Sequence, residues 1–312
     1  MKLLNNLSIP AVSGYEDDIA AVIKSQLDNT GITYFSDAHK SIVAHIPGVG
    51  EPLMFVCAMD TTGLFITYIE ENGFLRFSVA GKIDEKQLSG RKVMFKNGVF
   101  GIIGGGEKVS DMFIDIGAKN REEASTTVSI SDPVALDPSL TQISNSTFAG
   151  YRAGKTAIIY AMLEGAKKLK EANRCAYFVF AAKTAHTPSM GFLNMISEKP
   201  ALAYIIDTCA ALDTPADDIT PTRLGSGTAL KIMDGSIISD AAAIEHIEKI
   251  KSSTPLFYRV VTDTAGILPK FQTEAEETDT ATLSLPVRYM GLQNEVFSVS
   301  DLSSLVTLIS RI

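Results

Sequence analysis

The chain has 312 residues, 46% of them hydrophobic and 21% charged, which suits a soluble globular protein of about two domains. A net charge of −8 argues against nucleic acid or an anionic membrane as the main partner. Three cysteines exclude a disulfide scaffold, and no apolar run approaches the roughly 20 residues that cross a bilayer. Residues 1–6 become polar too early for a signal peptide, so we expect a cytoplasmic protein without a membrane partner.

In chain order, Ser13 and Glu16 fit a capping box and predict a helix that starts there. Short, continuous apolar runs predict buried strands at 53–58, 176–182, 202–206 and 281–287. Apolar residues at helical spacing predict helices near 158–169, 243–250 and 300–309. Alternating strands and helices indicate an α/β fold with a mixed sheet and helices on both faces.

The segment from residue 64 to residue 148 has a different pattern. It combines near-alternating apolar residues with glycines at short intervals, and it has little helical periodicity. This pattern is typical of a small β-barrel. We therefore predict an α/β domain built from residues 1–62 and 149–312, interrupted by a β-rich insert of residues 63–148.

Residues 149–156 match a relaxed phosphate-binding loop, and a predicted helix follows them. Such a loop normally follows a buried strand, whereas residues 141–147 are mostly polar. Nucleotide binding through 149–156 therefore stays open as a second alternative.

Several motifs recur in an order that is known from one peptidase family. They are Ile9–Glu16, Gly73–Phe77, Gly90–Val93, Ile114–Ala118 and Pro286–Met290, with Glu295 just beyond. On these motifs the chain resembles the tetrahedral (TET) aminopeptidases, also called glutamyl or deblocking aminopeptidases, of metallopeptidase family forty-two. Some relatives are labelled endoglucanase or cellulase. The resemblance implies the zinc-aminopeptidase-like α/β fold and a dimerisation role for the insert.

The resemblance also implies a chemistry, namely removal of an amino-terminal residue by two zinc or cobalt ions and a glutamate base. The family holds its metals with two His, a bridging Asp, a Glu and a further Asp. Carried over position by position, the first His is Ala58 and the bridging Asp is Gly150. The Glu ligand is Lys183, and the last His is Gly291.

Two acidic positions of the family pattern remain. Asp207 keeps the further Asp ligand, and Asp60 keeps a residue whose family role is to orient the missing His. The base position is Ala182, so no catalytic residue is intact. Because Ala and Gly offer no donor atoms, we expect no metal ligand beyond Asp207 and no cofactor in this chain.

Two hypotheses concern what replaces the metals. The Lys183 ammonium would take the place of a cation and pair with Asp207 or Asp60; alternatively, it points into the solvent. Cys57, Cys209 and His186 lie near these positions in the sequence and could form a replacement metal site, although no spacing supports one.

The leading functional prediction is an aminopeptidase-family protein that has lost catalysis and serves as a binding, regulatory or assembly paralogue. The expected partners are further copies in a dimer or dodecamer, an active paralogue in a mixed oligomer, or a peptide or small-molecule ligand. The alternative is an active aminopeptidase or other hydrolase with an altered or relocated site.

Overall fold

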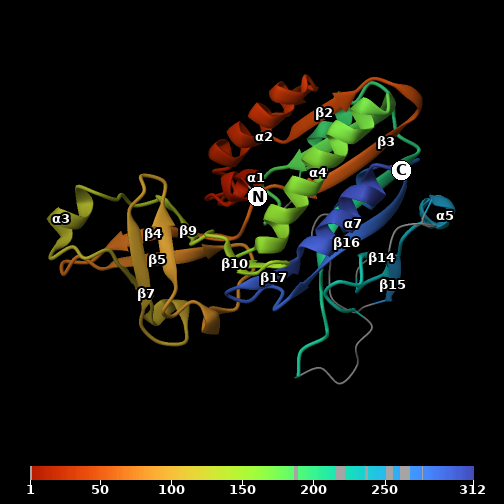
Figure 1. Cartoon of the computed structure of the whole chain (residues 1–312). Helices are drawn as coiled ribbons and strands as arrows, with labels where there is room; N and C mark the ends of the chain where they lie inside the picture. Colours follow the sequence, from red (N-terminus) through yellow and green to blue (C-terminus); the bar gives the residue numbers. More distant parts are fainter. Residues whose placement is uncertain are drawn as a thin grey trace.

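The computed structural model describes residues 2–185, 189–215, 222–235, 238–250, 256–260, 268–275 and 277–312. These residues form a large mixed sheet with helices and a separate β-barrel (Figure 1). Among them, no helix is both long and apolar enough to cross a membrane.

The main sheet carries the α/β part of the fold. In spatial order its strands are β1 (Thr33–Ser36), β2 (Ile42–Ile46), β12 (Arg174–Ala181), β3 (Val49–Ala58), β13 (Leu202–Ala210), β16 (Asp279–Arg288), β17 (Glu295–Ser298), β11 (Thr147–Gly150) and β10 (Thr141–Ser144). Two further strands branch from β16, namely β14 (Thr228–Met233) and β15 (Leu256–Val260). The four strands predicted from apolar runs are β3, β12, β13 and β16, which confirms those predictions.

The strand directions bring several chain segments to one edge of this sheet. Strands β12, β3, β13 and β16 are mutually parallel. Strand β17 reverses the direction and β11 reverses it again, so β11 also runs parallel to β16. We call the edge at which these five parallel strands end the carboxyl edge; it is where open α/β sheets bind ligands.

Helices cover both faces of the sheet, as predicted. On one face lie α1 (Lys2–Leu7), α2 (Asp17–Thr30), α4 (Ala153–Glu171), α5 (Ala241–Ile250) and α7 (Val299–Ile309). The long helix α4 lies along β12 and packs against α1, α2 and α7 (Figure 1). The opposite face packs against the 3-10 helix η3 (Gly191–Met195) and α6 (Leu268–Glu274), through Phe192 and Phe271.

The predicted barrel is present as a closed, antiparallel ring with its own core. The ring order is β4 (Gly63–Ile69), β5 (Leu75–Ala80), β8 (Phe113–Asp115), β7 (Phe100–Gly104), β6 (Lys92–Phe95) and β9 (Pro133–Leu136). Short helical segments lie between its strands: η1 (Glu85–Gln87), η2 (Val109–Asp111) and α3 (Arg121–Ser125). The last barrel strand ends at Leu136, and the following β10 and β11 pair with each other and with the main sheet. The division at residues 62/63 and 148/149 stays a prediction.

The predicted capping box at Ser13 is wrong. Helix α2 begins at Asp17, after a turn in which Gly14 has φ 91°, and no side chain caps it. The Glu16 Oε1 atom accepts the Gly14 N–H at 2.7 Å and the Lys183 N–H at 2.8 Å. Glu16 therefore joins the start of α2 to the end of β12 instead of closing a local cap.

Candidate functional site at the carboxyl edge

The structure brings all seven positions from the sequence analysis to the carboxyl edge or to the loops that leave it. Each one lies near or just beyond the carboxyl end of a parallel strand: Ala58 at the end of β3 and Asp60 after it, Ala182 and Lys183 after β12, Asp207 near the end of β13, Gly150 at the end of β11, and Gly291 in the connection from β16 to β17. Residues from distant parts of the chain are thus adjacent because five parallel strands end together. Their roles stay predictions.

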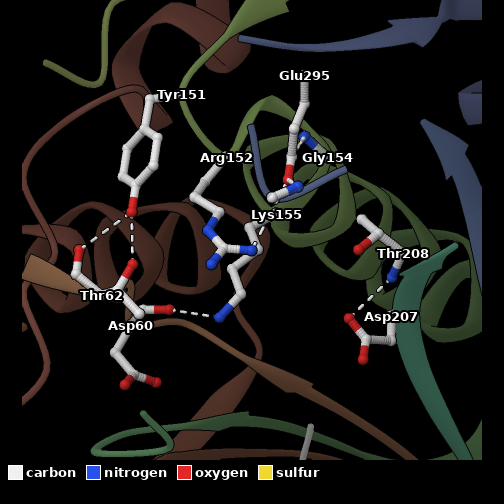
Figure 2. A network of polar contacts seen from close by, with 10 residues as sticks. Asp60, Thr62, Tyr151, Arg152, Gly154, Lys155, Asp207, Thr208 and Glu295 are labelled. Carbon is white, nitrogen blue, oxygen red and sulfur yellow. Dashed lines mark hydrogen bonds and ion pairs between the residues drawn. The ribbon is translucent and has the colours of Figure 1, made fainter. Parts of the chain in front are cut away.

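Asp60 is fully buried, and hydrogen bonds use both of its carboxylate oxygens. Oδ1 accepts the Thr184 hydroxyl at 2.6 Å, and Oδ2 accepts the N–H groups of Thr184 at 2.8 Å and Ala185 at 3.0 Å. The Asp60 backbone oxygen accepts Lys155 Nζ at 2.7 Å (Figure 2). Asp60 therefore fastens the end of β3 to the segment after β12 and to α4.

The hypothesis that Lys183 replaces a metal cation is wrong. Within the described part of the chain, no ion pair joins Lys183 to Asp60 or Asp207, and the lysine is exposed. The physical reason is that Thr184 and Ala185 already satisfy the Asp60 carboxylate, so it does not need a cation. The Lys183 backbone has φ 56°, a left-handed conformation that turns the chain away from β12.

Glu16 is a buried acid of the site that sequence reasoning did not place there. Burial raises the pKa of its carboxyl above the ordinary 4.5, and the nearby Asp60 charge adds to that rise. The N–H groups of Gly14 and Lys183 oppose the rise by donating to Oε1, while Oε2 is buried without a partner among the described residues. The sequence signal for Glu16 is an acidic residue within the Ile9–Glu16 motif. Its contact with Lys183 could not be read from the sequence, because the two residues are 167 positions apart.

Glu295 is a second buried acid, and it lies at the amino terminus of α4. Its side chain is 1% exposed; Oε2 accepts the Gly154 N–H at 3.2 Å and Oε1 accepts the Gly291 N–H at 3.1 Å. Arg152 Nη1 lies 3.8 Å from Oε1 (Figure 2). Burial alone would lower the pKa of the Arg152 guanidinium. Tyr151 and the Glu295 carboxylate favour its charged form more strongly, so the pKa is raised.

This arrangement weakens the nucleotide alternative. A phosphate would bind the N–H groups at the amino terminus of α4, and the Glu295 carboxylate already binds one of them. Only Tyr151 and Arg152 separate β11 from α4, which is too short a loop to surround a phosphate chain. The Lys155 amine, which would contact phosphate in such a loop, is bound to the Asp60 carbonyl.

The two glycines at predicted ligand positions differ in their surroundings. A Cβ atom added to Gly150 would lie 2.6 Å from the Ser139 carbonyl oxygen, in the connection between β9 and β10. A Cβ atom added to Gly291 would meet no atom within 4 Å, but this residue has φ 77°. The backbone has therefore adapted to glycine at both positions, by close contact at one and by conformation at the other.

The remaining predicted positions offer little chemistry. Ala182 is fully buried, and its N–H donates to Ser41 Oγ at 3.2 Å. Asp207 is partly buried, and its Oδ1 accepts the Thr208 N–H at 2.8 Å (Figure 2). Burial strongly raises the pKa of the Cys57 thiol, which keeps it protonated. His186, the third member of the hypothetical replacement site, lies outside the described residues.

Comparison with known proteins decides the family. Residues 40–308 match the M42 glutamyl aminopeptidase family, which covers most of the chain and both parts of the fold. The chain belongs to that family. The predicted resemblance is therefore confirmed.

Relatives and solved structures agree with the assignment. A putative aminopeptidase of Acetivibrio thermocellus is 29% identical over 96% of this chain and 94% of its own length. The lysyl aminopeptidase of Pyrococcus furiosus is 25% identical, over 96% and 92% of the two chains. The Pyrococcus horikoshii TET1 peptidase, which assembles into a tetrahedron or a large octahedral shell, is 25% identical with a TM-score of 0.85, covering 99% of this chain and 98% of its own.

Family membership corrects one prediction. We expected no cofactor. The M42 family normally uses divalent metal ions, and this contradicts that expectation. In the ranges that the structure describes, no group of three or more His, Cys, Asp or Glu side chains could hold a metal ion. The described residues therefore do not fit a two-metal centre.

Proposed function

We propose that this M42 family member binds ligands or partner subunits at the carboxyl edge without hydrolysing peptides. The observation that carries the proposal is the identity of the side chains at that edge. Of the positions that resemblance assigns to ligands and base, Asp207 alone carries a carboxylate, and the others are Ala58, Gly150, Ala182, Lys183 and Gly291. Alanine and glycine side chains can neither hold a metal ion that would polarise a carbonyl nor take a proton from water, and Asp207 alone cannot hold two metal ions.

The surrounding contacts support a structural role for the acids that remain. Asp60 binds the segment after β12, Glu16 binds the backbone of Lys183, and Glu295 binds the start of α4. Each of these three carboxylates accepts backbone N–H groups. They hold the edge in one conformation, which suits a preformed binding surface.

Self-association is the second part of the proposal, with the barrel as the contact surface. The barrel and its connections expose four large apolar side chains that an interface could cover: Tyr68, Phe100, Ile102 and Ile130, each 47–56% exposed. The TET relatives form a dodecamer or larger shells. We infer a homo-oligomer, or a mixed oligomer with a catalytically competent relative. A cytoplasmic location stays our prediction, on the basis of three buried free cysteines.

The experiment is an aminopeptidase assay on the purified full chain with zinc or cobalt ions supplied. Glutamyl, lysyl and leucyl p-nitroanilides serve as substrates, and Asp207→Asn is the matched control variant. The proposal predicts the same background rate for both proteins. Turnover by the wild-type chain that Asp207→Asn abolishes would establish the alternative, an active hydrolase with an altered site.

A further inference from the structure

A pocket of about 190 Å³ lies where the barrel meets the main sheet. Arg91 lines it from just before β6 and Lys92 from the start of β6. Asp137 and Ser139 line it from the connection between β9 and β10, Tyr151 from the loop between β11 and α4, and Asn294 from the turn before β17. Its volume is more than ten times the roughly 15 Å³ that one water needs, so a small polyatomic ligand fits. None of the carboxyl-edge acids described above lines it.

Arg91 is the unusual residue of this pocket. It is 3% exposed, and none of its three guanidinium nitrogens has a hydrogen-bond partner among the described residues. It forms no ion pair with any described acid either; its guanidinium lies over the Tyr151 ring, whose centroid is 5.1 Å from Cζ. A buried charge without a partner is costly, and burial lowers the pKa of this guanidinium, with the Arg152 charge acting in the same direction.

The acid that lines the pocket is already engaged elsewhere. Asp137 Oδ2 lies 3.4 Å from Lys92 Nζ, and Oδ1 accepts both the N–H and the hydroxyl of Ser139. Burial would raise the pKa of this carboxyl, but Ser139 and Lys92 outweigh it, so the pKa is lowered and the acid stays ionised. Lys92 is thus shared, whereas the five N–H donors of the buried Arg91, which also lines the pocket, have no partner among the described residues.

We propose that this pocket binds a small oxyanion, the carboxylate or phosphate group of a small molecule, through the Arg91 guanidinium. A guanidinium fork matches the paired oxygens of either group, and a planar bidentate contact satisfies two of its donors at once. Lys92, which also lines the pocket, supplies further positive potential. The proposal goes beyond the proposed function, since equilibrium binding at this pocket does not depend on hydrolysis at the carboxyl edge.

The test compares sodium phosphate and sodium succinate with sodium chloride at equal ionic strength, using the full chain. Isothermal titration calorimetry gives the affinity, and thermal unfolding gives the shift in Tm that a ligand of the native state produces. The wild-type chain should bind one or both oxyanions. Arg91→Met should weaken that binding about tenfold or more, as expected for the loss of charge-assisted hydrogen bonds. Arg121→Met, at the far end of the barrel, is the matched control and should bind as the wild type does.

Two measurements separate a loss of oxyanion binding from a loss of folding. Because Met replaces an unpaired buried charge with an apolar side chain of similar length, Arg91→Met should unfold at the same temperature as the wild type or higher when no oxyanion is present. Arg91→Lys keeps the charge but loses the fork, and should bind more weakly than the wild type. Binding of phosphate alone or succinate alone identifies the ligand group. No binding by the wild type, or equal binding by Arg91→Met, would overturn the proposal.

Discussion

The substitution Gly150→Ala tests whether the carboxyl edge has closed over a predicted ligand position. The added Cβ would lie 2.6 Å from the Ser139 carbonyl oxygen, and Leu140 Cα would be 3.4 Å away. Both neighbours belong to the backbone, so no side chain can rotate to make room. The connection between β9 and β10 has to move, together with its hydrogen bonds to Asp137.

The expected loss follows from two opposing effects. Inserting a methyl group into a packed site typically costs about 1–3 kcal/mol. Replacing glycine with alanine in an ordinary conformation returns about 0.4–1 kcal/mol by restricting the unfolded chain. We therefore expect Gly150→Ala to lower the free energy of unfolding by about 1–2 kcal/mol. Gly150→Asp should lower it further, because its carboxylate needs additional space and solvation.

The assay is urea unfolding followed by far-ultraviolet circular dichroism, since the chain has no tryptophan. Gly191→Ala is the matched control, because its Cβ would meet its nearest neighbour at an ordinary 3.5 Å. That variant should be as stable as the wild type or slightly more stable. If Gly150→Ala equals Gly191→Ala in stability, the connection does not press on Gly150 and the reasoning is wrong.

Three further predictions concern buried acids and the barrel. Burial raises the pKa of Glu16, so the native state binds more protons than the unfolded state, and wild-type stability falls as pH rises from the ordinary value of 4.5 through the raised pKa. Glu16→Gln should remove that fall. The free energy of unfolding of the variant minus that of the wild type should therefore grow with pH in denaturation curves. Thr184→Val should cost about 1.5–3 kcal/mol in chemical denaturation by removing a hydroxyl from the buried Asp60 carboxylate, and an unchanged midpoint would contradict this. Ile102→Glu should shift the protein to smaller species in light scattering, whereas an unchanged mass would remove the barrel surface from the assembly.

Much of the fold was predictable because its signals are local. Strands β3, β12 and β13 contain continuous apolar runs and β16 a run of apolar residues with small hydroxyl residues between them; all four are largely buried, and such runs are visible without any partner. Strand β10 gave no such signal, since all four of its residues are exposed and it is held by pairing with β11. Pairing is a long-range property that composition does not show.

The candidate site was predictable in its positions but not in its contacts. Parallel strand ends meet at one edge, so motifs after β3, β12 and β13 had to gather there once the fold was known. The partners of the acids could not be predicted: one hypothesis paired Lys183 with Asp207 or Asp60, whereas Thr184 and Ala185 bind Asp60. Those contacts depend on backbone conformation after β12. The cofactor prediction failed for a different reason, because it inferred the protein's needs from missing side chains alone.

The most direct measurement of the central claim is release of amino-terminal residues from a mixed peptide library, followed by mass spectrometry with zinc or cobalt ions present. The wild-type chain and Asp207→Asn are compared at equal concentration. The account predicts that both leave the library unchanged to the same extent. Shortening of peptides by one residue in the wild-type sample, absent from the Asp207→Asn sample, would contradict it.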